Sequence, residues 1–264
     1  MFSNLKRLLG YRALIQSLVA RDLKARYRGS VLGFLWSFVN PLLLLSIYAF
    51  VFTQVLEAPR GERQPYALFI FCGLLPWTWF SSSLIEASTV LVSGGNLIRK
   101  VLFPAEVLPI VTVFATLVHF CLGLLIVAGA IAYTPQVTVT WTDLLWLPVI
   151  MLVQLVLTLG LALLLSALTV HFRDLRDLVV NALTLWFWAT PIIYPIDAVA
   201  ERWQALLRLN PFTHLAIAYQ QVLFVEGPYP QWPALLALGA GAFVTLGFGY
   251  FVFDRLRDTL AEAV

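Results

Sequence analysis

The chain has 264 residues, of which 61% are hydrophobic and only 12% are charged, and its formal net charge is +3. Soluble proteins average roughly 25% charged residues, so this composition excludes an ordinary soluble domain. The mean hydropathy of +0.87 agrees with a membrane domain, and the length leaves no room for a nucleotide-binding domain of ordinary size. The two cysteines, Cys72 and Cys121, lie inside apolar runs and form no zinc or redox motif.

A basic, partly amphipathic segment precedes the first apolar stretch. Its apolar residues recur at helical spacing and predict an interfacial helix: Tyr11, Leu14, Ile15 and Leu18. A strongly basic stretch follows, with the cations Arg21, Lys24, Arg26 and Arg28. Two interpretations stay open. The cations are an ordinary positive-inside anchor, or they attract anionic head groups or a phosphate-bearing substrate, at about 1 kcal/mol per cation.

Six apolar stretches follow, each long enough to cross a bilayer as a helix, in which every backbone polar group is paired internally. The predicted spans are residues 31–56, 66–92, 107–133, 144–170, 178–196 and 232–253. An even number of spans places both chain ends on one side of the membrane. Thirteen basic residues fall on that side and four on the other, so the positive-inside rule predicts that both termini are cytoplasmic.

Two short cytoplasmic loops carry their charges in compact units. Residues 93–104 combine a glycine break, Asn96 as a helix cap and a proline stop. In residues 171–177, Arg173 and Asp177 have the spacing of a helical ion pair. Two interpretations of these loops stay open. Their residues form tight turns whose charges only orient the chain in the membrane, or the two loops are docking surfaces for a cytoplasmic partner.

The region between the fifth and sixth spans is apolar but interrupted. No uninterrupted run of 18 apolar residues survives between residues 197 and 230, so we expect two short re-entrant or interfacial helices on the outer side, with a break at Asn210 and Pro211. The last span contains several glycines suited to close helix packing: Gly239, Gly241, Gly247 and Gly249.

Four tryptophans lie near the middle of predicted spans rather than at the membrane interfaces: Trp77, Trp79, Trp186 and Trp188. There an indole N–H finds no water unless it faces a neighbour, a cavity or a polar ligand. Aromatic rings stack on the C–H faces of sugars, so tryptophans along a conduit suit a carbohydrate, with Trp77 and Phe80 on one helix face. Packing between helices explains these aromatics equally well.

Several chemical sites are absent from the sequence. There is no phosphate-binding GxxxxGK[ST] loop, no HExxH, no GxSxG elbow and no pair of intramembrane carboxylates. Among ionisable residues, only Glu86 and His119 are candidates for a deep position within spans, and a position of Glu86 close to the cytoplasmic interface is the alternative; an ion-coupled transporter needs a fuller relay. We therefore expect the chain to be no enzyme, with its energy source on another polypeptide.

Residues 21–42 resemble the N-terminal signature of the permease subunits of polysaccharide-export ABC transporters, the type-2 permeases that export O-antigen, teichoic acid and capsule. Further stretches resemble the same family in order and spacing: residues 100–109, 172–178, 190–195 and 209–220. The similarity extends from about residue 20 to residue 225. The resemblance implies an all-α integral membrane protein, a single six-span permease domain with an N-terminal amphipathic helix and short re-entrant outer helices.

The resemblance also implies partners and roles. It implies a homodimer in the bacterial plasma (inner) membrane, with two copies of a separate ATPase that carries ATP and Mg²⁺, and no cofactor or metal on this chain. Arg21, Lys24, Arg26 and Arg28 then meet the diphosphate of a polyprenyl-linked glycan. Trp77, Phe80, Trp186, Trp188 and Tyr194 line the glycan path. The ATPase docks against Asn96, Leu97, Arg99, Lys100, Phe103, Arg173 and Arg176.

The expected mechanism is gated access driven from outside the chain: ATP binding closes the two ATPases, the coupling helices transmit the movement, and the dimer interface opens for a lipid-anchored polymer. Two alternatives remain. One is a permease of the same fold that exports a small molecule. The other is a membrane-embedded enzyme or assembly factor for lipid-linked sugars, which needs an acidic pair or metal ligands at the membrane surface.

Overall fold

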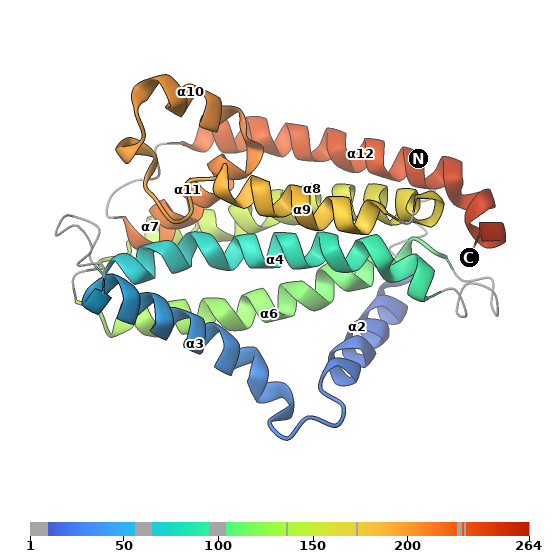
Figure 1. Ribbon diagram of the computed structural model, residues 1–264, viewed down its shortest axis with the longest axis horizontal. Helices are drawn as coiled ribbons and strands as arrows, with labels where there is room; N and C mark the ends of the chain where they lie inside the picture. The colour runs from blue at the N-terminus through green and yellow to red at the C-terminus, as the bar shows by residue number, and fades with distance from the viewer. Residues whose placement is uncertain are drawn as a thin grey trace.

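Long helices lie side by side along one direction in the computed structural model (Figure 1). The structure describes residues 10–55, 65–94, 104–135, 137–172, 174–225, 229 and 231–263. Its elements are α2 (Arg12–Arg26), η1 (Gly33–Leu35), α3 (Trp36–Phe50), η2 (Val51–Val55), α4 (Tyr66–Ser93), α6 (Val107–Ala132), α7 (Trp141–Leu144), α8 (Trp146–His171), α9 (Leu175–Trp188), η3 (Ile196–Ala198), α10 (Glu201–Leu209), α11 (Pro211–Phe224) and α12 (Trp232–Ala263). No strand occurs among these residues, so the predicted all-α class is confirmed.

Five helical stretches of the described chain are long and apolar enough to cross a membrane. They are Gly33–Val55, Tyr66–Ser93, Val107–Ala132, Thr142–His171 and Trp232–Arg257. Five of the six predicted spans therefore correspond to long helices, with ends that differ by a few residues. The agreement reflects the rule that the hydrocarbon core demands ~20 apolar residues in one helix.

The predicted span at residues 178–196 is not confirmed as one continuous helix, and with it the count of six. Helix α9 has 14 residues, which cover only ~21 Å at 1.5 Å per residue. It ends at Trp188, three residues before Pro191. A proline lacks the backbone N–H that an interior helical position needs and disfavours helical geometry in the residue before it, so the apolar run continues beyond the helix.

The beginning of α2 and the end of α12 both contact residues at the start of α6. Tyr11 and Leu14 pack against Val107 at the start of α6. At the same end, Nη2 of Arg257 lies 3.9 Å from Oε2 of the buried Glu106. The start of the first described helix and the end of the last one therefore both lie near the start of α6.

Helix α4 is the centre of the bundle, and α3 lies at its edge. Within its most apolar window, 78% of α4 is buried, against 6% for the stretch that contains α3. Several large apolar side chains of that stretch are exposed: Leu42, Leu43, Ile47 and Phe50. This stretch packs one side against the core, through Leu44, Leu45, Tyr48 and Phe52, and leaves a large apolar surface exposed.

Helices α8 and α12 approach each other most closely at two glycines. A Cβ on Gly160 would lie 2.6 Å from the backbone N of Leu246, and one on Gly249 would overlap the carbonyl oxygen of Gly160. Around Gly241, by contrast, there is open space. The prediction of glycine-mediated packing is therefore confirmed for Gly249 and is wrong for Gly241.

Two short helices separated at Asn210 follow α9, as the sequence predicts. Helix α10 is exposed, with Trp203 and Leu209 more than half exposed. Helix α11 enters the bundle, where Phe212, Leu215 and Tyr219 are fully buried. Pro211 begins α11 at a position where a missing N–H costs nothing, and the side chain of Asn210 caps it.

Candidate functional site

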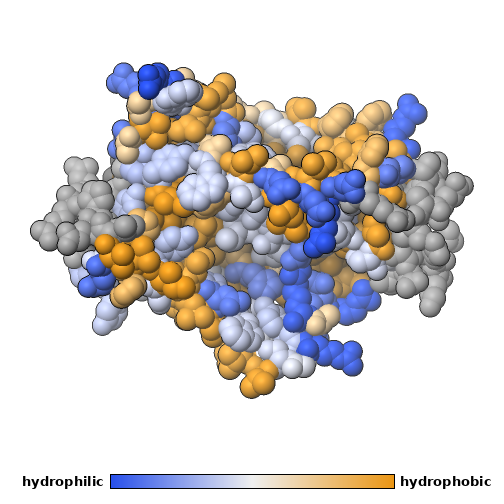
Figure 2. Space-filling view, in the orientation of Figure 1, coloured by the Kyte–Doolittle hydropathy of each residue, from blue (hydrophilic) through white to orange (hydrophobic). Residues whose placement is uncertain are grey.

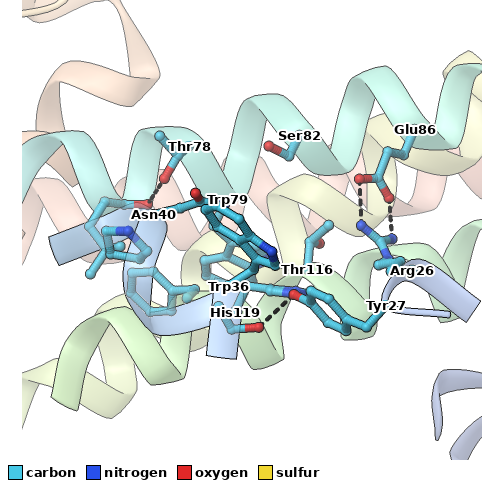
Figure 3. Close-up of a pocket in the computed structure, with 14 residues that line it drawn as sticks. Arg26, Tyr27, Trp36, Asn40, Thr78, Trp79, Ser82, Glu86, Thr116 and His119 are labelled. Carbon is cyan, nitrogen blue, oxygen red and sulfur yellow. Dashed lines mark hydrogen bonds and ion pairs between the residues drawn. The ribbon is translucent and has the colours of Figure 1, made fainter. Parts of the chain in front are cut away.

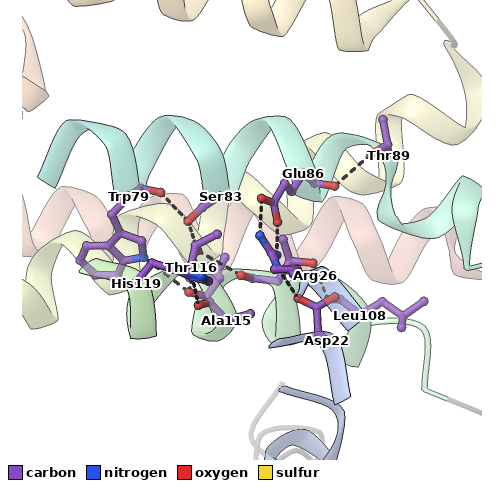
Figure 4. Close-up of polar contacts among 12 residues, drawn as sticks. Asp22, Arg26, Trp79, Ser83, Glu86, Thr89, Leu108, Ala115, Thr116 and His119 are labelled. Atoms are coloured by element: carbon purple, nitrogen blue, oxygen red, sulfur yellow. Dashed lines mark hydrogen bonds and ion pairs between the residues drawn. The ribbon is translucent and has the colours of Figure 1, made fainter. Parts of the chain in front are cut away.

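The end of α2 meets α4 and α6 in a group of polar side chains, the polar junction, drawn in part in Figure 4: Asp22, Arg26, Tyr27, Ser37, Glu86 and His119. Arg26 donates to both carboxylate oxygens of Glu86, with 2.8 Å between Nη1 and Oε1, and its Nε donates to Asp22 at 2.9 Å. Such two-pronged arginine–carboxylate pairs are strong and directional. The junction therefore fixes the last turn of α2 to α4.

The positive charge of Arg26 is balanced by two neighbouring carboxylates. Partial burial alone would lower its pKa, but the hydrogen bonds and negative charges of Glu86 and Asp22 outweigh that effect and raise the pKa. One guanidinium thus faces two carboxylates, and the group of three carries a net charge of −1. A further anion at Arg26 would have to displace one of them.

The residue after α2 makes the second link of the junction. The hydroxyl of Tyr27 lies 2.5 Å from Nε2 of His119 and 2.5 Å from Oγ of Ser37. Nδ1 of His119 lies 3.0 Å from the carbonyl oxygen of Ala115, which only accepts, so a neutral imidazole carries its proton there. Nε2 then accepts from Tyr27, and Ser37 donates to the tyrosine oxygen. Three segments, α2, α3 and α6, are held by one hydroxyl.

Neighbouring polar contacts join α4 to α6. Oγ of Ser83 lies 2.7 Å from Oγ1 of Thr116, and the indole N–H of Trp79 donates to the carbonyl of Val113 at 3.4 Å. The ring of Trp79 stacks on Phe120, with 4.9 Å between centroids. These contacts hold α4 and α6 together beside the polar junction.

A cavity of about 310 Å³ adjoins the polar junction (Figure 3). Helix α3 contributes Trp36 and Asn40 to its wall, and α4 contributes Thr78, Trp79 and Ser82. Figure 2 shows hydrophilic residues gathered in the lower centre of this face, where α2, α3 and α4 come together, with apolar surface to the left of them. Aromatic, amide, hydroxyl and carboxylate groups thus converge on one small space, a composition typical of small-molecule sites.

The predicted phosphate-binding cations divide into two groups. Arg21, Lys24 and Arg28 are exposed, whereas Arg26 is held by carboxylates. The apolar stripe of the same segment is confirmed as one face of α2, with Leu18 buried against Val107 and Val111 of α6. Three cations are therefore free to meet an anion from solution or from the bilayer, and their role stays a prediction.

The predicted glycan-path residues are also divided. Trp77 and Phe80 are buried in an aromatic cluster with Trp186. The ring centroids of Trp77 and Phe212 are 4.8 Å apart, and those of Phe80 and Trp186 are 5.4 Å apart. Trp188 is 63% exposed, and the Tyr194 hydroxyl donates to its carbonyl at 3.0 Å. In this conformation Trp77 and Phe80 are buried, Trp186 and Tyr194 are half-buried and Trp188 is exposed, and lining of a path stays a prediction for all five.

Asn210 joins this aromatic cluster to the re-entrant helix. Its Oδ1 accepts from the indole N–H of Trp186 at 2.6 Å and from the backbone N–H of Phe212 at 2.9 Å. Its Nδ2 donates to the carbonyl of Ala189 at 3.1 Å and to Thr190 Oγ1 at 2.9 Å. The end of α9 and the start of α11 are thereby connected through one side chain.

The predicted ATPase-coupling residues lie mostly outside the described residues. This holds for Asn96, Leu97, Arg99, Lys100, Phe103 and Arg173. Arg176 is described and is exposed on the first turn of α9. Among the described residues, no group of three or more histidine, cysteine, aspartate or glutamate side chains could hold a metal ion.

Sequence reasoning identified Glu86 and His119 as the deep ionisable residues but missed the side chains around them. Tyr27, Ser37 and Asn40 lie in the stretch that resembles the family signature, but neither that resemblance nor the lone hydroxyl of Ser82 indicates which groups these side chains face. The one available signal was Glu86 itself: a carboxylate within an apolar span needs a partner, and the basic stretch at the end of α2 holds cations that could provide one.

Comparison with known proteins gives full-length relatives. Residues 13–224 match the family described as ABC-2 type transporter. The chain is 41% identical to the O-antigen export system permease protein RfbA of Myxococcus xanthus, over 98% of both chains, and 33% identical to the protein of that name in Klebsiella pneumoniae, over 96% of both. It is 20% identical to the polysialic acid transport protein KpsM of Escherichia coli, over 94% of this chain and 95% of that one.

Proposed function

The chain belongs to the ABC-2 type transporter family, and we propose that it is the membrane-spanning subunit of an exporter that moves a lipid-linked polysaccharide such as O-antigen across the bacterial plasma membrane. The observation that carries this function is the full-length identity of 41% to an O-antigen export permease. The exposed cations of α2 suit a lipid diphosphate, and the exported glycan extends from that diphosphate.

The energy comes from a separate ATPase, present in two copies that bind ATP and Mg²⁺. The absence of a phosphate-binding loop from the whole sequence supports this division of labour. The segment 96–103 and Arg176 are the proposed contact with the ATPase. Both termini of the chain lie on the cytoplasmic side, where the ATPase binds.

A second copy of the chain covers the apolar surface of α3 and α9. Apolar side chains on both helices are exposed in the single protomer: Leu42, Leu43, Ile47, Leu178, Leu185 and Trp188. A homodimer that packs along these helices places the translocation path between the two copies, with Trp188 and Tyr194 beside it. Trp77, Phe80 and Trp186 join the path only when their cluster opens.

Purification of the tagged chain from its native membranes in mild detergent tests this function. We expect a Walker-type ATPase in near-equimolar amount and, after reconstitution in vesicles, ATP-dependent movement of lipid-linked O-antigen. Recovery of the chain alone, or with glycosyltransferases only, would contradict the proposal. Stimulation of ATP hydrolysis by a small apolar molecule and by no glycan would indicate export of small molecules instead.

A further inference from the structure

The cavity beside the polar junction has unpaired hydrogen-bonding groups in its wall. Within the described part of the chain, no other protein group hydrogen-bonds to the Asn40 amide, the Ser82 hydroxyl or the Trp36 indole N–H; Asn40 and Trp36 are exposed and Ser82 is half-buried, so all three can be reached from the cavity. All three belong to helices that are long and apolar enough to span a membrane. There, unpaired polar groups cost free energy unless water or a ligand satisfies them.

The same cavity offers an aromatic wall and the space of a single ring. Trp36 and Trp79 line it, and Trp79 is held in place by its stacking on Phe120. Its volume of about 310 Å³ is at the lower end of ligand sites, which range over ~300–1,000 Å³. Apolar ring faces with a few fixed polar groups favour a ligand that has both C–H faces and hydroxyl groups.

The charges in the wall disfavour an anion. Arg26 is paired with both Glu86 and Asp22, so its group carries a net charge of −1. A phosphate in the cavity would face this negative charge and would have to break a two-pronged ion pair. The oxygens of Glu86 and the hydroxyl groups nearby instead accept hydrogen bonds from a neutral polyol.

We propose that this cavity binds one uncharged sugar ring of the exported glycan, a subsite within each protomer that is separate from the exposed phosphate-attracting cations. The inference rests on the proposed function, since the glycan is the source of the ring. Asn40 and Ser82 bind its hydroxyl groups, and Trp36 packs against its C–H face.

The test uses the complete permease–ATPase complex in lipid nanodiscs. The probes are the neutral monosaccharides released by hydrolysis of the cell's own surface polysaccharide, with inorganic phosphate as the anionic probe. Saturation-transfer NMR detects weak ligands, so it reports which sugar binds and at what concentration. We expect saturable binding of at least one sugar, weakened at least tenfold in N40L and in S82A, and no competition by phosphate.

S81A is the matched control. Ser81 is the neighbour of Ser82 on α4, but its hydroxyl bonds to the carbonyl of Trp77 within its own helix and does not line the cavity. Sugar binding should therefore be unchanged in S81A. Absence of saturable binding, equal binding by N40L, S82A and wild type, or displacement by phosphate would each overturn the subsite.

ATP-dependent glycan export by the same wild-type complex separates the two proposals. Export without any sugar bound at the cavity would remove the subsite and leave the proposed function intact. Failure of the wild-type complex to export any glycan would instead remove the proposed function.

Discussion

The hydroxyl of Tyr27 lies 2.5 Å from Nε2 of His119, although the two residues are 92 positions apart in the chain. The contact connects the end of α2 to the middle of α6, and the bond to Ser37 extends it to the start of α3. This one hydroxyl therefore joins the start of the first membrane-spanning stretch to both α2 and α6.

Replacement of Tyr27 by phenylalanine keeps the ring and removes the hydroxyl. His119 and Ser37 then lose a partner, and an unpaired buried polar group costs ~1–3 kcal/mol. We expect a lower thermal unfolding midpoint for the purified Y27F complex. Y133F is the control, because Tyr133 is 92% exposed. An equal midpoint for Y27F and Y133F would show that the bond contributes nothing measurable.

The ion pair between Arg26 and Glu86 predicts a double-mutant cycle. E86Q leaves Arg26 paired with Asp22 alone, R26Q leaves both carboxylates without the arginine, and the double variant leaves Asp22 as the one charge of the three. The side chains are 28% and 36% exposed, so the coupling should be on the order of 1–2 kcal/mol, between surface and buried pairs. Urea unfolding of the three variants measures it. D22N should have a smaller effect, since Asp22 is more exposed. Additive effects of R26Q and E86Q would exclude the coupling.

Long apolar runs made most of the fold predictable, because the bilayer requires ~20 apolar residues per span and the helix supplies all the backbone hydrogen bonds. The end of α9 could not be predicted in this way, because the apolar run continues past Trp188 although Pro191 disfavours a continuous helix. The same limit applies to the junction. Glu86 was recognised as a deep charge, but its contact with Arg26 joins residues 60 positions apart, and no local periodicity encodes such a contact.

Asn210 provides a separate test of the outer region. N210A removes the acceptor for the Trp186 indole and the cap of α11, and loss of a cap alone costs ~0.5–2 kcal/mol. N210D keeps the acceptor oxygen and the cap, but it loses the two donated bonds and brings a carboxylate oxygen close to the carbonyl of Ala189, so it should fall between wild type and N210A. Thermal unfolding with tryptophan fluorescence detects both the midpoint and the environment of Trp186. Equal midpoints for the two variants would show that the accepted bonds do not matter.

The contact of α8 with α12 predicts opposite results for two glycines of one helix. G249A pushes a methyl group into the backbone of Gly160, so the helices must separate, and overpacking of this kind costs ~1–3 kcal/mol. G241A meets open space and gains helix propensity, at about 1 kcal/mol. We expect the unfolding midpoint to fall in G249A and to stay equal or rise in G241A. The reverse order would contradict the packing.

The exposed cations of α2 should govern the affinity for the lipid diphosphate. K24Q and R28Q each remove about 1 kcal/mol of attraction at the membrane surface, or about fivefold in affinity. The concentration of lipid-linked glycan that half-stimulates ATP hydrolysis should rise by that factor in each, with the maximal rate unchanged. R202Q is the control, since Arg202 lies on α10 and faces Trp203. Because the attraction is electrostatic, high salt should reduce the difference between K24Q and wild type. An equal shift in R202Q, or no shift in K24Q and R28Q, would assign these cations to orientation of the chain in the membrane instead.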